Sequence, residues 1–175
     1  MLPKTRGFKL GMLNINGLLA HIDQLRKLLT DLDFDIMAIN ETKLDCSCSN
    51  DLVRIDGYSL ERNDRNTNGG GVALYIRNAL SYIVRNDLVI VPNMEIIVIE
   101  IHKPKSKPFL VSTWYRPPGS SIDLLKDFEM FLKAVDFEDK ESILLGDINC
   151  NLAAHPKDSL ASQMKFIYDT INILN

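Results

Sequence analysis

Four short polar clusters combine carboxylate and amide side chains in a way that suits phosphodiester chemistry. They are Asn14-Ile15-Asn16-Gly17, Asn40-Glu41-Thr42, Tyr115-Arg116-Pro117-Pro118-Gly119 and Gly146-Asp147-Ile148-Asn149. Glu41 and Asp147 offer the hard oxygen ligands that Mg²⁺ takes when it keeps several of its own waters. Asn14 and Asn149 can orient a phosphate oxygen or a water without adding negative charge. Together these residues predict metal-assisted hydrolysis of a phosphodiester, with a carboxylate preparing the attacking water.

The third cluster adds a phenol and a guanidinium to this set. Tyr115 can donate a hydrogen bond to a phosphate, and Arg116 can pair with one. Taken singly, each residue also has a structural interpretation: Asn14 suits a helix N-cap, and Asp147 suits a tight turn. The occurrence of four such clusters in one chain favours a catalytic site over four unrelated turns.

Each cluster lies at the end of a predicted strand, where side chains from several strands of an α/β protein converge on a ligand. Apolar runs predict strands over residues 8–15, 36–39, 58–62, 71–77, 81–91, 95–102, 108–115 and 142–145. Apolar positions three or four apart predict helices over residues 18–32, 124–135 and 160–174. Glycine, proline and asparagine predict turns at residues 66–71, 86–87 and 103–108. The opening strand–helix–strand unit predicts two parallel strands, and the helix-free middle predicts antiparallel pairing.

The composition is that of one ordinary globular domain. The chain has 175 residues, of which 46% are apolar, with 20 basic and 23 acidic side chains. This balance excludes a disordered tail, and the net charge of −3 argues against a protein held to nucleic acid by bulk charge alone. We expect no membrane span and no secretory signal, because no apolar stretch reaches about 18 residues and none follows Met1.

The three cysteines suggest where the protein is located but do not identify a catalytic or metal-binding motif. Cys46, Cys48 and Cys150 are odd in number, and the first two are too close together for a standard zinc knuckle. Reduced thiols in an intracellular protein are the expected state. A Cys/His metal site with His155 is the alternative.

The ordered set of motifs resembles the endonuclease/exonuclease/phosphatase superfamily. Besides the four clusters, the chain carries Gly69-Gly70-Gly71-Val72-Ala73 and a Trp114 before the Tyr-Arg-Pro-Pro segment. These two segments resemble most closely the apurinic-type endonuclease of non-LTR retrotransposons, which nicks target DNA so that the element's reverse transcriptase can prime there. The resemblance implies a four-layer α/β-β/α sandwich of two mainly antiparallel sheets flanked by helices.

The resemblance also implies a role for each candidate residue. Glu41 would be the principal metal-binding carboxylate, and Asn14 would help to orient metal and phosphate. Tyr115 would donate a hydrogen bond to the scissile phosphate. Asp147 would position or activate the water, and Asn149 would contact the phosphate or the transition state. The implied cofactor is Mg²⁺, with Mn²⁺ as a substitute.

Three arginines are candidate contacts to the DNA backbone, and a solvated surface position is the alternative for each: Arg62, Arg65 and Arg116. The implied partners are DNA as substrate and a reverse transcriptase domain in the parent polypeptide. The implied location is intracellular and nuclear, away from membranes.

One family segment has no counterpart in the sequence. The family pattern closes with Ser-Asp-His, and we therefore expect residues 1–175 to be a single domain that is incomplete at its C-terminus and lacks the last strands. Loss of a positioned acid/base group costs about 10²- to 10⁴-fold in rate, so we expect an impaired nuclease with exposed apolar sheet edges.

Two further interpretations stay open at this point. The first is a superfamily phosphodiesterase acting on another phosphoester, such as a phosphoinositide, a sphingomyelin-like lipid or RNA. The second is a non-catalytic remnant or binding module that retains part of the fold. An ordinary dinucleotide-binding fold is not expected, because no Gly-x-Gly-x-x-Gly follows the first strand.

Overall fold

A computed structural model describes residues 7–92, 94–150, 162, 164 and 165 of the chain. Its regular elements begin with β1 (Leu10–Asn14), α1 (Leu18–Leu32), β2 (Ile36–Asn40), the 3₁₀ turn η1 (Asn50–Val53), β3 (Tyr58–Asn63) and β4 (Val72–Arg77). They continue with β5 (Ser81–Val84), the 3₁₀ turn η2 (Asn86–Leu88), β6 (Glu95–His102), β7 (Phe109–Tyr115), α2 (Asp123–Phe137) and β8 (Ser142–Asp147). The predicted helix over residues 160–174 lies almost entirely outside the described residues.

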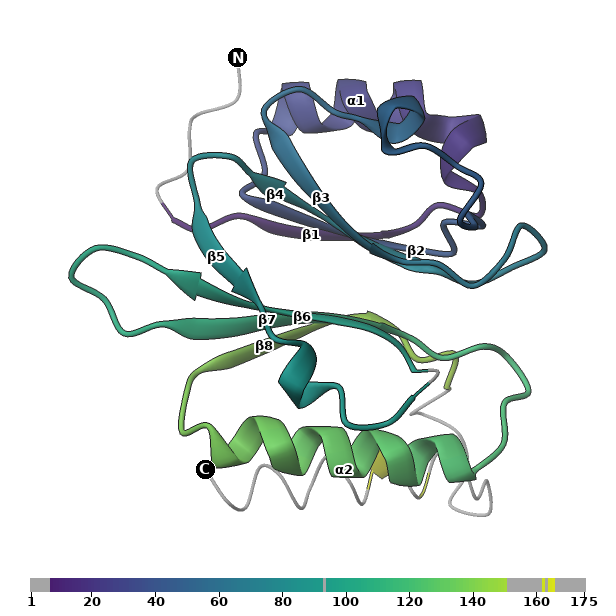
Figure 1. Ribbon diagram of the computed structural model, residues 1–175, viewed down its shortest axis with the longest axis vertical. Helices are drawn as coiled ribbons and strands as arrows, with labels where there is room; N and C mark the ends of the chain where they lie inside the picture. Colours follow the sequence, from purple (N-terminus) through teal and green to yellow (C-terminus); the bar gives the residue numbers. More distant parts are fainter. Residues whose placement is uncertain (1–6, 93, 151–161, 163, 166–175) are drawn as a thin grey trace.

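The elements form four layers, with α1 above one sheet and α2 below the other (Figure 1). One sheet has the strand order β1-β2-β4-β3, and the other has the order β5-β6-β7-β8. Two strand pairs are parallel, β1 with β2 and β7 with β8, and the other four pairs are antiparallel. The expected sandwich of two mainly antiparallel sheets is confirmed.

The sheets pack on both faces because their strands are apolar on both sides. In β2, Ile36 and Ala38 face the other sheet, whereas Met37 and Ile39 pack under α1. This alternation is the period-2 geometry of a strand, and it lets one continuous apolar run contribute to two cores. The same holds for β6 and β7, whose alternate residues meet either the first sheet or α2.

Most sequence-based boundaries agree with the structure, but the strand predicted over residues 81–91 is wrong beyond Val84. Arg85 there forms ion pairs with Asp87, Glu100 and Glu138, and the chain turns through η2 and buries Leu88. The apolar run is continuous with that of β5 because a turn that buries its side chains is apolar as well. The predicted turn at residues 103–108 is confirmed as the β6–β7 connection.

Two strands at the outer edge of their sheets expose apolar side chains. Met12 of β1 and Leu144 of β8 are both exposed, although each lies within a strand. Among the described residues, none of the helices is long and apolar enough to cross a membrane.

Candidate active site

The ends of four strands from the two sheets meet at one end of the sandwich. β1 and β2 end at Asn14 and Asn40, which face each other in parallel register. β7 and β8 end at Tyr115 and Asp147, which face each other in the same way. Because β7 starts at the β6–β7 hairpin, this cluster of strand ends lies at the end of the molecule opposite that hairpin (Figure 1).

The Asn14 amide joins the two sheets at this point. Its Nδ2 donates to Oε1 of Glu41 at 2.8 Å and to Oδ2 of Asp147 at 3.0 Å. Asn14 and Asp147 are 133 positions apart in the sequence, so only the packing of one sheet on the other brings them together. Two carboxylates thus share one neutral donor.

Tyr115 supplies a second neutral donor to the same carboxylate. Its hydroxyl donates to Oε1 of Glu41 at 3.0 Å, and the residue is 3% exposed. Burial, the hydrogen bond to Glu41 and the charge of Glu41 raise the pKa of Tyr115 to about 12. The hydroxyl therefore keeps its proton near neutral pH and remains a hydrogen-bond donor.

Asn149 orients Asp147 from the loop after β8. Its main-chain N–H donates to Oδ1 of Asp147 at 3.1 Å, and its side-chain Nδ2 donates to the carbonyl of Arg116 at 2.9 Å. The Asn149 side chain is thus engaged with the loop after β7 in this structure. It stands beside the cluster rather than within the bridge between the two carboxylates.

Left-handed backbone is concentrated around the cluster. Four non-glycine residues of this region have a positive φ: Asn16 (50°), Glu41 (56°), Lys43 (51°) and Asn149 (44°). Such conformations cost on the order of 1–3 kcal/mol each and persist only where the surroundings fix them. A strained backbone at Glu41 favours a functional site over a chance turn.

The glycine run supports Glu41 from behind. The carbonyls of Gly71 and Gly70 accept hydrogen bonds from the main-chain N–H groups of Thr42 (3.2 Å) and Lys43 (2.9 Å). A Cβ on Gly71 would lie 2.3 Å from Oγ1 of Thr42, so only glycine permits this approach. The run is thus a packing element of the site.

Sequence reasoning missed Glu95, the first residue of β6. Its Oε1 accepts from Nη1 of Arg65 at 2.8 Å, and its Oε2 accepts from the Gly71 N–H at 2.5 Å. Burial raises the pKa of Glu95, the Gly71 and Arg65 contacts oppose this rise, and the charge of Glu41 adds to it. Glu95 sits inside an apolar strand pattern with no motif around it, so nothing in the local sequence marks it.

The three arginines have different environments. Arg65 has a side chain that is 37% exposed, and its guanidinium lies 6.0 Å from the Tyr115 ring centroid. Arg62 lies on the α1 side of its sheet, where its Nη2 donates to the Cys48 carbonyl at 2.6 Å. Arg116 is 1% exposed, and its Nη2 donates to the Ser120 carbonyl at 2.9 Å. A guanidinium buried in this way is not placed to contact a DNA phosphate, so the structure argues against that role for Arg116.

The histidines and cysteines contribute nothing to the cluster within the described residues. His21 lies on α1, and His102 pairs with Glu100 at 3.3 Å at the end of β6. The three cysteines are thiols rather than disulfides. The alternative metal ligand His155 lies outside the described residues.

The carboxylate pair fits a divalent cation that keeps its own waters. The donors to Glu41 and Asp147 are an amide, a phenol and a main-chain N–H, and all are neutral, so they leave both negative charges in place. No group of three or more His, Cys, Asp and Glu side chains suited to a metal occurs in the described part of the chain. Mg²⁺ needs only one or two carboxylates besides water and phosphate oxygens, whereas a structural Zn²⁺ needs four protein ligands.

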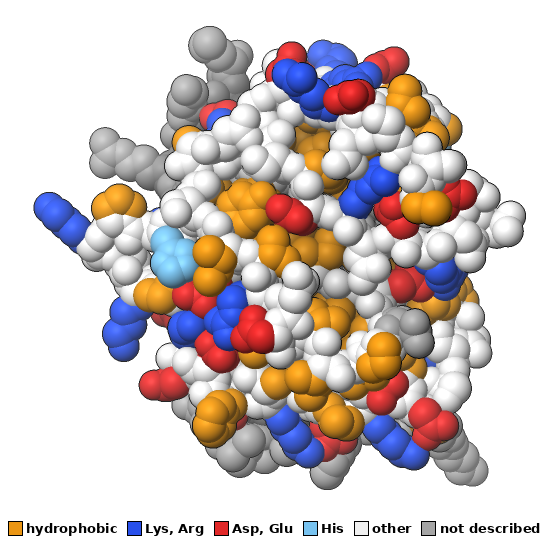
Figure 2. Space-filling view, viewed as in Figure 1, with side chains coloured by type: hydrophobic (Ala, Val, Ile, Leu, Met, Phe, Trp, Pro, Cys, Tyr) orange, Lys and Arg blue, Asp and Glu red, His pale blue; other side chains and the backbone are white. Residues whose placement is uncertain are grey.

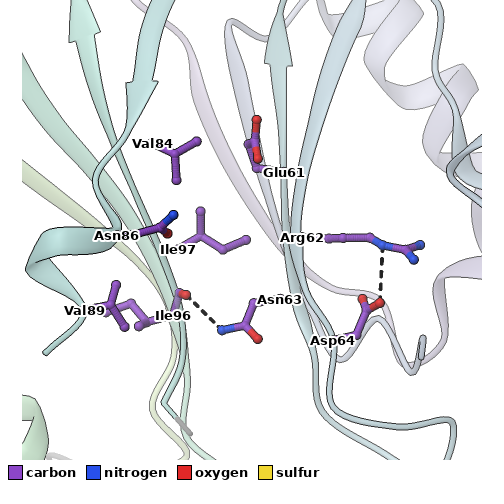
Figure 3. A pocket seen from close by; sticks show the side chains of 9 residues that line it. All are labelled: Glu61, Arg62, Asn63, Asp64, Val84, Asn86, Val89, Ile96 and Ile97. Atoms are coloured by element: carbon purple, nitrogen blue, oxygen red, sulfur yellow. Dashed lines mark hydrogen bonds and ion pairs between the residues drawn. The ribbon is translucent and has the colours of Figure 1, made fainter. Parts of the chain in front are cut away.

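Neither of two cavities in the structure contains the whole cluster. A cavity of about 580 Å³ opens between the sheets at the edge strands β3 and β5, where Asn63 donates to the Ile96 carbonyl (Figure 3). A smaller hollow of about 340 Å³ lies between β1 and α1 and includes Asn14 in its wall. On the face shown in Figure 2, acidic and basic side chains are interspersed, in line with the small net charge.

The pattern of the Endonuclease/Exonuclease/phosphatase family matches residues 13–169. The chain belongs to this family. The resemblance inferred from the motifs is thereby confirmed, and the family's members are hydrolytic nucleases and phosphatases. A comparison with curated proteins gives no match by sequence.

Solved structures with the same fold include several DNA-acting enzymes. The endonuclease domain of TRAS1, a telomere-specific non-LTR retrotransposon, superposes with a TM-score of 0.71 at 16% identity, covering 94% of this chain and 71% of that domain. The AP endonuclease LMAP from Leishmania major superposes with a TM-score of 0.69 at 17% identity, covering 95% of this chain and 66% of LMAP. The 3′ phosphatase NExo from Neisseria, bound to a product DNA hairpin, superposes with a TM-score of 0.63 at 19% identity, covering 93% of this chain and 71% of NExo. At these identities the likeness is one of fold, and this chain spans about two thirds of the length of LMAP.

Proposed function

We propose that this chain is a divalent-metal-dependent phosphodiesterase that nicks DNA. The observation that carries the proposal is the bridging amide of Asn14, which draws Glu41 and Asp147 from different sheets onto one donor atom. The four strand ends place two carboxylates with neutral hydrogen-bond partners side by side. Such a site can bind a cation, a phosphate and a water. A lysine or arginine at this place would neutralise the carboxylates, whereas these neutral donors leave their negative charge available to a cation.

In this proposal Glu41 and Asn14 hold the metal, which is Mg²⁺ with Mn²⁺ as a substitute. When bound, such an ion stabilises the negative charge that develops on a phosphodiester during hydrolysis. The left-handed backbone at Glu41 and the glycine run behind it keep the carboxylate directed at the cluster. Preorganisation of this kind avoids a cost of reorganisation during the reaction.

The other residues act on the phosphate and the water. Tyr115 stays protonated and, after release of its hydrogen bond to Glu41, donates one to a phosphate oxygen. Asp147 orients the attacking water and accepts its proton, since the Asn14 and Asn149 contacts fix both of its oxygens. Asn149 contacts the phosphate after release of its side-chain hydrogen bond to the Arg116 carbonyl.

The finer parts of the proposal depend on the motifs and on the TRAS1 neighbour. We infer a retrotransposon-type endonuclease domain, joined in its parent polypeptide to a reverse transcriptase and acting in the nucleus. Arg65 is the arginine best placed to contact DNA, because its exposed guanidinium lies beside Tyr115. A small net charge agrees with DNA binding through a few contacts near the site.

A substrate comparison tests the proposal. Supercoiled plasmid and a lipid phosphodiester are each incubated with an excess of the chain in Mg²⁺, Mn²⁺ or EDTA. We expect open-circular plasmid with either metal, none in EDTA, and no lipid hydrolysis. Lipid hydrolysis without nicking would instead indicate a family phosphodiesterase with another substrate, and the absence of both products would indicate a non-catalytic module.

A further inference from the structure

Glu95 lies next to the cluster and joins Arg65 to the glycine run. It forms no hydrogen bond with Asn14 or Asp147 among those of the cluster. Its side chain is 11% exposed, and its Oε2 accepts from the Gly71 N–H while its Oε1 accepts from Nη1 of Arg65. A buried carboxylate costs free energy unless hydrogen bonds and a countercharge offset its lost hydration. Here both oxygens have such a partner.

One oxygen of Glu95 fixes the main chain behind Glu41. The Gly71 N–H donates to Glu95, and the Gly71 carbonyl accepts from the N–H of Thr42, the residue after Glu41. Gly70 pairs with Lys43 in the same way. Two peptide groups therefore connect the Glu95 carboxylate to the strained backbone that carries Glu41.

The other oxygen of Glu95 holds Arg65 over Tyr115. Nη1 of Arg65 donates to Glu95, and its Nε donates to the Gly69 carbonyl at 2.8 Å. A Cβ on Gly70 would lie 2.4 Å from both Cζ of Arg65 and Oε2 of Glu95, so the ion pair packs directly on the glycine backbone. The guanidinium is thus held on three sides beside the Tyr115 ring.

We propose that Glu95 is a positioning residue of the active site, which fixes the glycine run behind Glu41 with one carboxylate oxygen and orients Arg65 toward the substrate with the other. This inference rests on the proposed function for its catalytic consequence, but its structural consequence is independent of metal and of DNA. An ordinary surface ion pair would contribute little to stability and would leave the site unaffected.

The first test needs no activity. Amide hydrogen exchange of the metal-free chain is measured for the wild type, for Glu95→Ala and Glu95→Gln, and for Glu129→Gln, which removes one charge of the Glu129–Lys133 pair on α2. We expect the Thr42 and Lys43 amides to exchange about 10-fold faster in Glu95→Ala than in the wild type, with α2 unchanged. Glu129→Gln should leave both amides as they are. Unchanged exchange in both Glu95 variants, or equal acceleration across the whole chain, would overturn the inference.

The second test uses Mg²⁺ and plasmid. Calorimetric Mg²⁺ affinity should fall about 10-fold in Glu95→Ala, as for other residues that orient metal ligands. Arg65→Gln and Glu95→Gln should each raise the KM for supercoiled plasmid with kcat within about twofold, and the double variant should be no worse than either single one. Additive effects, or a loss confined to kcat, would contradict a shared role. If the wild type neither binds Mg²⁺ nor nicks DNA, the proposed function fails, while the exchange experiment still decides the role of Glu95.

Discussion

Replacement of Gly146 by alanine is a demanding test of how the two parallel strands of the second sheet set up the site. Gly146 faces Trp114 in the β7–β8 register and has a φ of +151°. A Cβ at this position would lie 2.0 Å from the Trp114 carbonyl oxygen. Because that oxygen belongs to the main chain, no side-chain rotation relieves the contact, and β8 must move where it carries Asp147.

The cost can be sized against a matched control. A side chain at positive φ costs about 1–2 kcal/mol, and overpacking of a well-packed site adds about 1–3 kcal/mol. We therefore expect Gly146→Ala to lower the free energy of unfolding by about 3 kcal/mol, or about 6–12 °C in Tm for a chain of this size. The control is Gly57, which has a φ of +86° and nothing within 4 Å of an added Cβ. Gly57→Ala should therefore lower the free energy of unfolding by only about 1 kcal/mol.

Urea unfolding and thermal melts of the two variants measure this difference, and plasmid nicking reports on Asp147. Gly146→Ala should lose nicking activity at temperatures where it is still folded, whereas Gly57→Ala should keep it. Equal destabilisation of the two variants would refute the close approach of β8 to Trp114. Full activity in a folded Gly146→Ala would refute the dependence of Asp147 on that approach.

Three further predictions concern single side chains. Tyr115→Phe removes one hydrogen bond to Glu41, and we expect a loss of about 10-fold or more in the nicking rate with little change in Tm. Arg116→Ala leaves several main-chain carbonyls without their buried donor and should cost about 3 kcal/mol in urea unfolding, whereas a surface DNA contact would cost almost none. Hydrogen bonds from Arg85 and Lys140 lower the pKa of Glu138 to about 2, so this carboxylate stabilises the fold above its ordinary pKa of about 4.5 and the contribution is lost as the pH falls toward 2. Urea midpoints measured from pH 7 to pH 2.5 should show a smaller decline for Glu138→Gln than for the wild type.

Much of the fold is encoded locally and could be predicted. The period-2 and period-3.6 patterns identified every strand and both fully described helices, because each element buries an apolar face that repeats at its own period. The parallel pairing of β1 with β2 followed from the intervening helix α1. The insertion of β4 between β2 and β3 did not follow from any local pattern, since strand order depends on contacts between distant segments.

In the candidate site, too, some features are encoded locally and others depend on contacts between distant segments. The strand-end positions of Asn14, Glu41, Tyr115 and Asp147 were readable from short polar clusters, and the structure brings these four together. The burial of the Arg116 guanidinium among carbonyl groups could not be predicted, because its sequence context gives no sign of it. The role of Glu95 could not be predicted either, because its partners come from a loop about 30 residues earlier in the chain.

The central claim is that Glu41 and Asp147 together form a metal-dependent site for cleavage of DNA. Its most direct test is the single-turnover nicking rate of supercoiled plasmid at saturating Mg²⁺ for the wild type, Glu41→Gln, Asp147→Asn and the Glu129→Gln control. We predict that the first two variants each lose about 100-fold or more, that the control keeps the wild-type rate, and that EDTA abolishes nicking in all four proteins. Nicking that survives EDTA, or that is unaffected by both Glu41→Gln and Asp147→Asn, would contradict the account.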